Sequence, residues 1–103
     1  MEPILLFAAL IACSGEVAAP PLSPQAERGK AVYAANCTAC HNVDPSKAGS
    51  LGPELKGSTR ELVEARVMRA EYPAGYTPKR TSKLMPALPK LSTDIDALAA
   101  YLK

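Results

Sequence analysis

Apolar residues recur at helical spacing in several stretches of the chain, and none alternates convincingly as a β-strand would. The clearest pattern lies near the C-terminus, where four apolar residues repeat at i, i+3, i+4 and i+7: Ile95, Leu98, Ala99 and Leu102. This spacing places them on one face of a helix. We expect this helix to begin at Ser92, because Asp94 and Asp96 would then lie in its first turn, where the helix dipole favours negative charge.

An earlier helix is predicted to begin at Ser23–Pro24 and to run to Asn36. Serine caps the free N–H groups of a first turn, and proline at the first helical position lacks only an N–H that would be unpaired anyway. Gly29 lies inside this helix, where glycine costs about 1 kcal/mol relative to alanine. That cost indicates close contact with another backbone.

A helix between these two is predicted to begin at Ser58. Glu61 follows three residues later and completes a capping box. Three apolar residues then share one face: Val63, Val67 and Ala70. The segment from Pro73 to Pro89 is rich in proline and predicts an extended loop. The chain is therefore predicted to be all-α with long loops.

The N-terminus carries an unbroken apolar run from Ile4 to Ala12. A membrane-spanning helix needs about 20 apolar residues, so the run is better explained as the centre of a signal peptide covering residues 1–12. It ends in Leu10-Ile11-Ala12-Cys13, which resembles a bacterial lipobox, whose cysteine is lipidated. We expect residues 13–23 to be a lipidated tether and residues 24–103 to be one domain. Alternatively, Cys13 is removed with a discarded leader, and the protein is soluble in the periplasm.

Composition limits what this domain can be. The 103 residues are 48% hydrophobic, yet they include only four Tyr, one Phe and no Trp. So few large side chains make a thin core, and a domain of this size gains from a buried cofactor. The net charge of +2, with no basic cluster, gives no indication of a nucleic-acid partner.

The chemistry is concentrated in Cys37-Thr38-Ala39-Cys40-His41, a C-x-x-C-H motif that is typical of haem c attachment. Two thiols three residues apart lie about one helical turn apart and can reach both vinyl groups on one porphyrin edge. The adjacent histidine can then reach the iron. We therefore predict one covalent haem c, with thioether bonds to Cys37 and Cys40 and His41 as an axial ligand.

Other interpretations of the motif are weaker. A structural zinc site needs four Cys or His ligands, and the domain offers three. A thioredoxin-type redox pair needs a βαβ context, whereas these flanks are predicted to be helical.

His41 is the only histidine in the chain, so a second histidine cannot ligate the iron within a monomer. The remaining candidates for the sixth position are methionine, lysine, asparagine, water or an empty site. Met68 lies within a predicted helix, where core packing explains it. Met85 lies in the proline-rich loop, and Pro86 favours an extended conformation there. We therefore favour Met85 as the second axial ligand.

Taken in order along residues 24–103, these features resemble a class I cytochrome c of the small bacterial type. Gly29 and Tyr33 precede the motif at the family's spacing, and Leu98 and Tyr101 resemble their packing partners. The resemblance implies that Gly29 allows the terminal helices to cross closely. It also implies that the carbonyl of Pro53 accepts a hydrogen bond from His41 and tunes its basicity.

The family's tryptophan partner for a haem propionate is absent. The resemblance offers three substitutes: Tyr76, Lys79 and Arg80.

The resemblance further implies the cytochrome c fold, with three main helices wrapped around one haem, and single-electron transfer rather than enzymatic turnover. Its partners would be redox proteins that dock transiently outside the cytoplasm, with no small-molecule substrate. Two alternatives remain open. One is a haem enzyme or gas-binding protein with a labile sixth ligand, and the other is a tethered cytochrome subunit of an oxidase or dehydrogenase complex.

Overall fold

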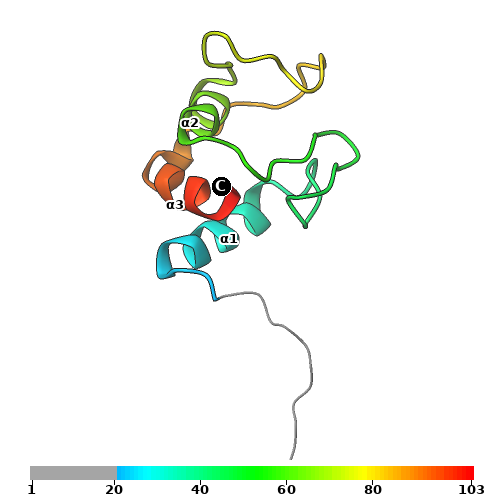
Figure 1. Cartoon of the computed structure of the whole chain (residues 1–103). Helices are drawn as coiled ribbons and strands as arrows, with labels where there is room; N and C mark the ends of the chain where they lie inside the picture. The colour runs from blue at the N-terminus through cyan, green and yellow to red at the C-terminus, as the bar shows by residue number, and fades with distance from the viewer. Residues whose placement is uncertain (1–20) are drawn as a thin grey trace, which may run out of the picture.

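The computed structural model describes residues 21–103, and all regular structure in this range is helical (Figure 1). The elements are α1 (Pro24–Asn36), α2 (Arg60–Arg69), the short 3-10 helix η1 (Pro89–Asp94) and α3 (Ile95–Leu102). The predicted all-α fold with three main helices is thus confirmed. The predicted signal peptide, Cys13 and most of the predicted tether lie outside the described residues.

Helix α1 begins and ends where the sequence predicts. The hydroxyl oxygen of Ser23 accepts a hydrogen bond from the Ala26 amide at 3.1 Å, and Pro24 occupies the first turn. At the other end, the amide of Cys37 donates to the carbonyl of Tyr33 at 2.9 Å. The last turn of α1 therefore leads directly into the C-x-x-C-H motif.

The predicted start of the second helix is wrong by one residue. Thr59, not Ser58, caps α2, and its hydroxyl oxygen accepts from the Leu62 amide at 3.1 Å. The Ser58 hydroxyl instead donates to the carbonyl of Leu55 at 2.6 Å, so it belongs to the preceding turn. Ala70 is also misassigned. It ends the helix with a left-handed φ of 55°, whereas Val63 and Val67 are buried as predicted.

The third helix also begins later than predicted. Ser92 lies in η1, where Leu91 departs from helical geometry with φ −92° and ψ 16°. Asp94 does not act at a helix start through its side chain. Its carboxylate accepts from Arg28 of α1, with the shorter N–O distance 2.6 Å. The predicted apolar stripe is confirmed for Ile95, Leu98 and Leu102, which are buried, while Ala99 packs at the edge of the core.

Helices α1 and α3 cross in close contact (Figure 1). A Cβ atom at Gly29 would collide with the carbonyl group of Ala97, so only glycine allows this crossing. Tyr33 is almost fully buried, and its ring centroid lies 5.7 Å from that of Tyr101. The close crossing implied by the family resemblance is therefore present.

We expect Gly29→Ala to destabilise the protein although alanine is the better helix former. The gain in helix propensity is about 1 kcal/mol, whereas overpacking a tight contact typically costs about 1–3 kcal/mol, and here the obstacle is backbone. Thermal unfolding of the haem-loaded protein followed by circular dichroism tests this. Lys30→Ala, an exposed neighbour on α1, is the control and should change little. A melting temperature for Gly29→Ala at or above that of the control would contradict the expectation.

Two long loops leave the helices on the same side of the molecule (Figure 1). The first connects α1 to α2 and contains His41, and the second connects α2 to η1 and contains Met85. Between residues 21 and 103, the structure contains no helix with the length and apolar character required to cross a membrane. The loops and the helices together enclose the candidate site.

Candidate functional site

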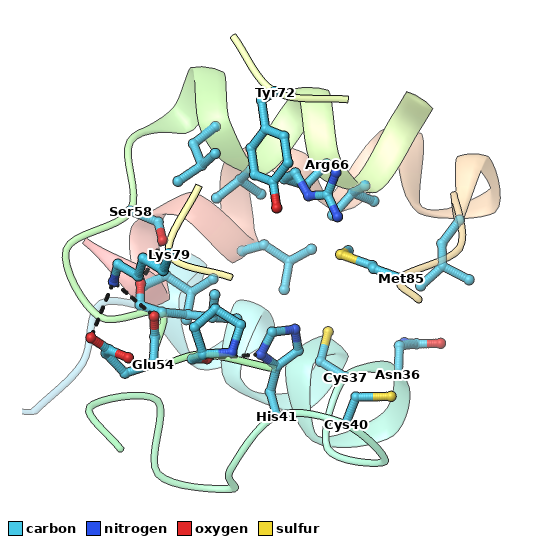
Figure 2. Close-up of a pocket in the computed structure, with 18 of the residues that line it drawn as sticks. Asn36, Cys37, Cys40, His41, Glu54, Ser58, Arg66, Tyr72, Lys79 and Met85 are labelled. Atoms are coloured by element: carbon cyan, nitrogen blue, oxygen red, sulfur yellow. Dashed lines mark hydrogen bonds and ion pairs between the residues drawn. The ribbon is translucent and has the colours of Figure 1, made fainter. Parts of the chain in front are cut away.

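A cavity of about 270 Å³ opens between the helices and the two long loops. Its wall is mainly apolar and draws on α2, α3 and both loops. The apolar side chains include Leu62, Val63, Val67, Leu98 and Leu102. The site residues predicted from sequence also line it, namely Cys37, Cys40, His41, Pro53 and Met85 (Figure 2). The fold therefore brings together residues that lie far apart in the sequence.

The C-x-x-C-H motif forms a compact turn at the end of α1. The amides of Cys40 and His41 both donate to the carbonyl of Cys37, at 3.3 and 3.0 Å. This turn places both thiols and the imidazole along one wall of the cavity (Figure 2). Both thiols are free, so no disulfide competes for them.

Burial raises the pKa of the Cys37 thiol to about 11. A reactive redox cysteine needs the opposite, an environment that lowers the pKa and favours the thiolate. In addition, no strand precedes the motif within the described residues. Both observations weigh against a thioredoxin-type pair.

His41 is held by the segment of residues 49–54, which we call the histidine-support segment. Its ring atom Nδ1 lies 3.0 Å from the carbonyl oxygen of Pro53. Gly52 packs directly against the ring, and a Cβ there would collide with it. The amide of Gly52 also donates to the carbonyl of Cys40 at 2.9 Å. With Nδ1 used in this way, Nε2 is left as the nitrogen available to a metal.

Sequence reasoning assigned no role to Gly49, which is as constrained as Gly52. A Cβ at Gly49 would meet backbone atoms of Cys40, His41 and Asn42. Its amide donates to the carbonyl of Gly52 at 2.8 Å. The sequence signal for this contact was a pair of glycines, three residues apart and shortly after His41, because glycine allows one backbone to pass close to another residue.

The two methionines considered from sequence both pack against the hydrophobic core, but only Met85 also lines the cavity. Met85 lines the cavity, and Figure 2 shows its sulfur directed towards the space that His41 faces from the other wall. Met68 packs against the hydrophobic core and is not among the residues that line the cavity. The core-packing interpretation of Met68 agrees with this position.

Two of the three polar residues suggested by the resemblance line the cavity. Tyr76 and Lys79 line it, but Arg80 does not and donates instead to the carbonyl of Gly49 at 3.2 Å. Arg66 and Tyr72, which sequence reasoning missed, also line the wall. The Arg66 guanidinium lies 4.1 Å from the centre of the Tyr72 ring. This cation–π contact depends on the turn after α2, which helical spacing alone does not reveal.

The cavity fits a flat, apolar iron porphyrin. Two thiols and an imidazole share one wall, a thioether sulfur faces them, and the remaining lining is largely apolar. A metal ion bound by protein side chains alone does not fit, because within residues 21–103 no group of three His, Cys, Asp or Glu side chains is arranged so that it could hold one. The donor set is therefore that of a cofactor with its own metal.

Comparison with known proteins gives two similarities. Residues 24–102 match a family described as "Cytochrome C oxidase, cbb3-type, subunit III". A "Cytochrome c-553-like" protein of Synechocystis sp. is 29% identical over 82 residues, which cover 80% of this chain and 70% of the relative. No solved structure matches the chain significantly. The family match runs from the start of α1 to the end of α3, so it includes every residue that lines the cavity.

Proposed function

The chain belongs to the c-type cytochrome family described as cbb3-type cytochrome c oxidase subunit III, and from this premise we propose that it carries single electrons on a haem c ligated by His41 and Met85. Membership implies one covalently bound haem c and a role in electron transfer outside the cytoplasm. The proposal adds the attachment residues Cys37 and Cys40 and the ligand pair.

The observation that carries the proposal is the position of Met85 in the wall that faces His41 (Figure 2). His41 is the only histidine of the chain, so a second histidine cannot be the other ligand within a monomer. Among residues 21–103, Met85 is the one thioether that lines this cavity. The absence of a second histidine also weighs against oxygen or peroxide chemistry, in which a distal histidine would assist.

The side chains around the cavity would keep the two ligand side chains in the same positions while an electron enters or leaves the haem. The haem supplies an iron that alternates between the ferric and ferrous states. The Pro53 carbonyl holds the imidazole orientation, and Gly52 lets the backbone approach the ring. The apolar side chains of α2 and α3 exclude water. Because His41 and Met85 stay in place, little reorganisation accompanies the transfer, and a thioether ligand raises the reduction potential.

Partners would dock transiently at the loops that carry the ligands. The large apolar side chains exposed on these loops include Val43, Leu51 and Leu84. Such contacts suit the small interfaces that are typical of electron-transfer encounters.

A potentiometric titration followed by the visible haem absorption tests the function directly. We expect a single reversible transition that fits a one-electron Nernst curve, in both the oxidative and the reductive direction. Hysteresis between the two directions, or turnover of peroxide at a substantial rate, would contradict a simple carrier.

A second candidate function follows from the family description, which names an oxidase subunit. In this case the same haem chemistry would serve inside a larger membrane complex rather than between separate partners. Purification from membranes in mild detergent separates the two. Stoichiometric retention of an oxidase with this chain would favour the subunit, and elution of the cytochrome alone would favour the carrier.

We also propose that Cys13 is lipidated and anchors the protein on the periplasmic side of a membrane. The support is the Leu-Ile-Ala-Cys sequence that follows the apolar run. Detergent phase partitioning of the haem-loaded protein tests it: the natural protein should enter the detergent phase, and residues 14–103 exported behind an unrelated cleavable leader should remain in the aqueous phase. Equal partitioning of the two proteins would refute lipidation and favour a soluble periplasmic form.

A further inference from the structure

The loop that carries Met85 is held by few backbone interactions. We call residues 70–88 the methionine loop. Within the described part of the chain, residues 77–87 form no backbone–backbone hydrogen bond. The nearest such bonds are at the borders, from Tyr76 to Pro73 and from Leu88 to Val67. Side chains must therefore contribute to fixing this stretch in one position.

Two consecutive cations in this stretch reach across to the histidine-support segment. Lys79 Nζ donates to the carbonyl oxygen of Glu54 at 2.9 Å and lies 3.6 Å from the Glu54 carboxylate (Figure 2). Arg80 Nη2 donates to the carbonyl oxygen of Gly49 at 3.2 Å. These contacts join residues that lie 25 and 31 positions apart in the chain.

Both acceptors lie in the segment that holds the His41 ring. Gly49 and Glu54 are its two ends, and Gly52 and Pro53, which contact the ring, lie between them. The two cations therefore connect the loop that carries Met85 to the segment that supports His41. No backbone hydrogen bond among the described residues makes that connection.

We propose that Lys79 and Arg80 clasp the methionine loop to the histidine-support segment, and that Arg80 is a positioning residue for Met85. The spectroscopic part of this proposal rests on the proposed His41 and Met85 ligation. The clasp itself is a restraint between two loops, and it rests only on the contacts that Lys79 and Arg80 form in the structure.

The two cations contribute unequally. The side chains of Lys79 and Glu54 are 40% and 47% exposed, and an ion pair this open to water contributes little. Arg80 is half-buried, and its part-buried hydrogen bond to a backbone carbonyl is less open to competing water than the Lys79 ion pair. Arg80 is therefore expected to be the stronger member of the clasp.

The test compares four variants of the haem-loaded protein: Arg80→Met, Arg80→Lys, Lys79→Met and Lys83→Met. Lys83 is the matched control, because it lies in the same loop, carries the same charge and forms no hydrogen bond or ion pair within residues 21–103. The first measurement is the rate at which the ferrous protein binds carbon monoxide, which requires Met85 to leave the iron. The second is hydrogen exchange of the hydrogen-bonded amides on both sides of the clasp, namely Leu88 at the end of the methionine loop and Gly49 and Gly52 in the histidine-support segment.

We expect Arg80→Met to bind carbon monoxide about tenfold faster than the unmodified protein, the size of effect that follows loss of a charge-assisted hydrogen bond. Lys79→Met should show a smaller increase, Arg80→Lys should recover part of the loss, and Lys83→Met should match the unmodified protein. Hydrogen exchange should follow the same order. Equal rates for Arg80→Met and Lys83→Met in both measurements would overturn the clasp.

Failure of the ligand assignment would give a different result. If the unmodified protein already binds carbon monoxide freely, Met85 is not the ligand, and hydrogen exchange alone decides on the clasp. Faster exchange in Arg80→Met than in Lys83→Met would then support the clasp, and equal exchange would overturn it.

Discussion

A variant with Cys37→Ala and Cys40→Ala, prepared without attached haem, is expected to be largely unfolded at room temperature. The reason is the cavity, because it occupies the space between the helices and the loops where a haem-free domain of this size would need packed side chains. Among the described large side chains, Tyr33 and Leu98 are the most deeply buried at 1% exposed, followed by Ile95 at 3% and Leu102 at 4%. The apolar residues of α2 and α3 that line the cavity would face water instead of a cofactor.

The expected size of the effect is comparable to the whole stability of a small domain. At about 24 cal/mol per Å³ of cavity, an empty space of 270 Å³ costs about 6 kcal/mol. Small domains are typically stable by about 5–15 kcal/mol in total. The haem-free chain would therefore retain little or no net stability.

Thermal unfolding followed by far-ultraviolet circular dichroism measures this effect. The haem-loaded protein should show a cooperative transition, and the double variant should show low helix content and no transition. Cys37→Ala alone is a useful control, because one thioether bond can still retain the haem. A cooperative transition in the haem-free double variant would show that the helices pack stably without the cofactor.

Replacement of Met85 by alanine is expected to lower the reduction potential on the order of 0.2 V, within the roughly 0.8 V range that axial ligands span. Loss of the thioether leaves the sixth position to water or to no ligand, which removes the preference for ferrous iron. The ferrous variant should also bind carbon monoxide readily. Redox titration and carbon monoxide difference spectra measure the two effects.

Met68→Ala is the matched control for this experiment. Met68 packs against the hydrophobic core and is not part of the cavity lining, so its loss should reduce stability while leaving the potential nearly unchanged. Equal potentials for Met85→Ala and the unmodified protein would remove Met85 from the ligand set.

Much of the fold could be predicted because local signals were strong. Ser23–Pro24 fixes the start of α1, and the spacing of Ile95, Leu98 and Leu102 identifies the buried face of α3. The errors lie where two adjacent residues compete for the same role. Ser58 and Thr59 can both cap a helix, and the choice depends on the Leu55 carbonyl that Ser58 contacts. Asp94 likewise pairs with Arg28, a partner that local sequence does not reveal.

The candidate site residues could be named from the sequence for a different reason. The C-x-x-C-H motif is continuous in sequence, and Met85 was separated from Met68 by its proline-rich context. The roles of Gly49, Arg66 and Tyr72 were not foreseen, because each depends on where a loop folds back against another segment. Arg80 was one of three candidates for a propionate contact, and its hydrogen bond to the carbonyl of Gly49 was not foreseen. Long loops without regular hydrogen bonding carry little sequence signal about such contacts.

The most direct test of His41 and Met85 ligation is the optical spectrum of the purified, haem-loaded protein. We predict a low-spin oxidised spectrum with a weak near-infrared band from sulfur bound to iron, and only slow spectral change when carbon monoxide is added to the reduced form. A high-spin oxidised spectrum with rapid carbon monoxide binding would contradict the ligand assignment and would favour a haem enzyme or gas-binding protein.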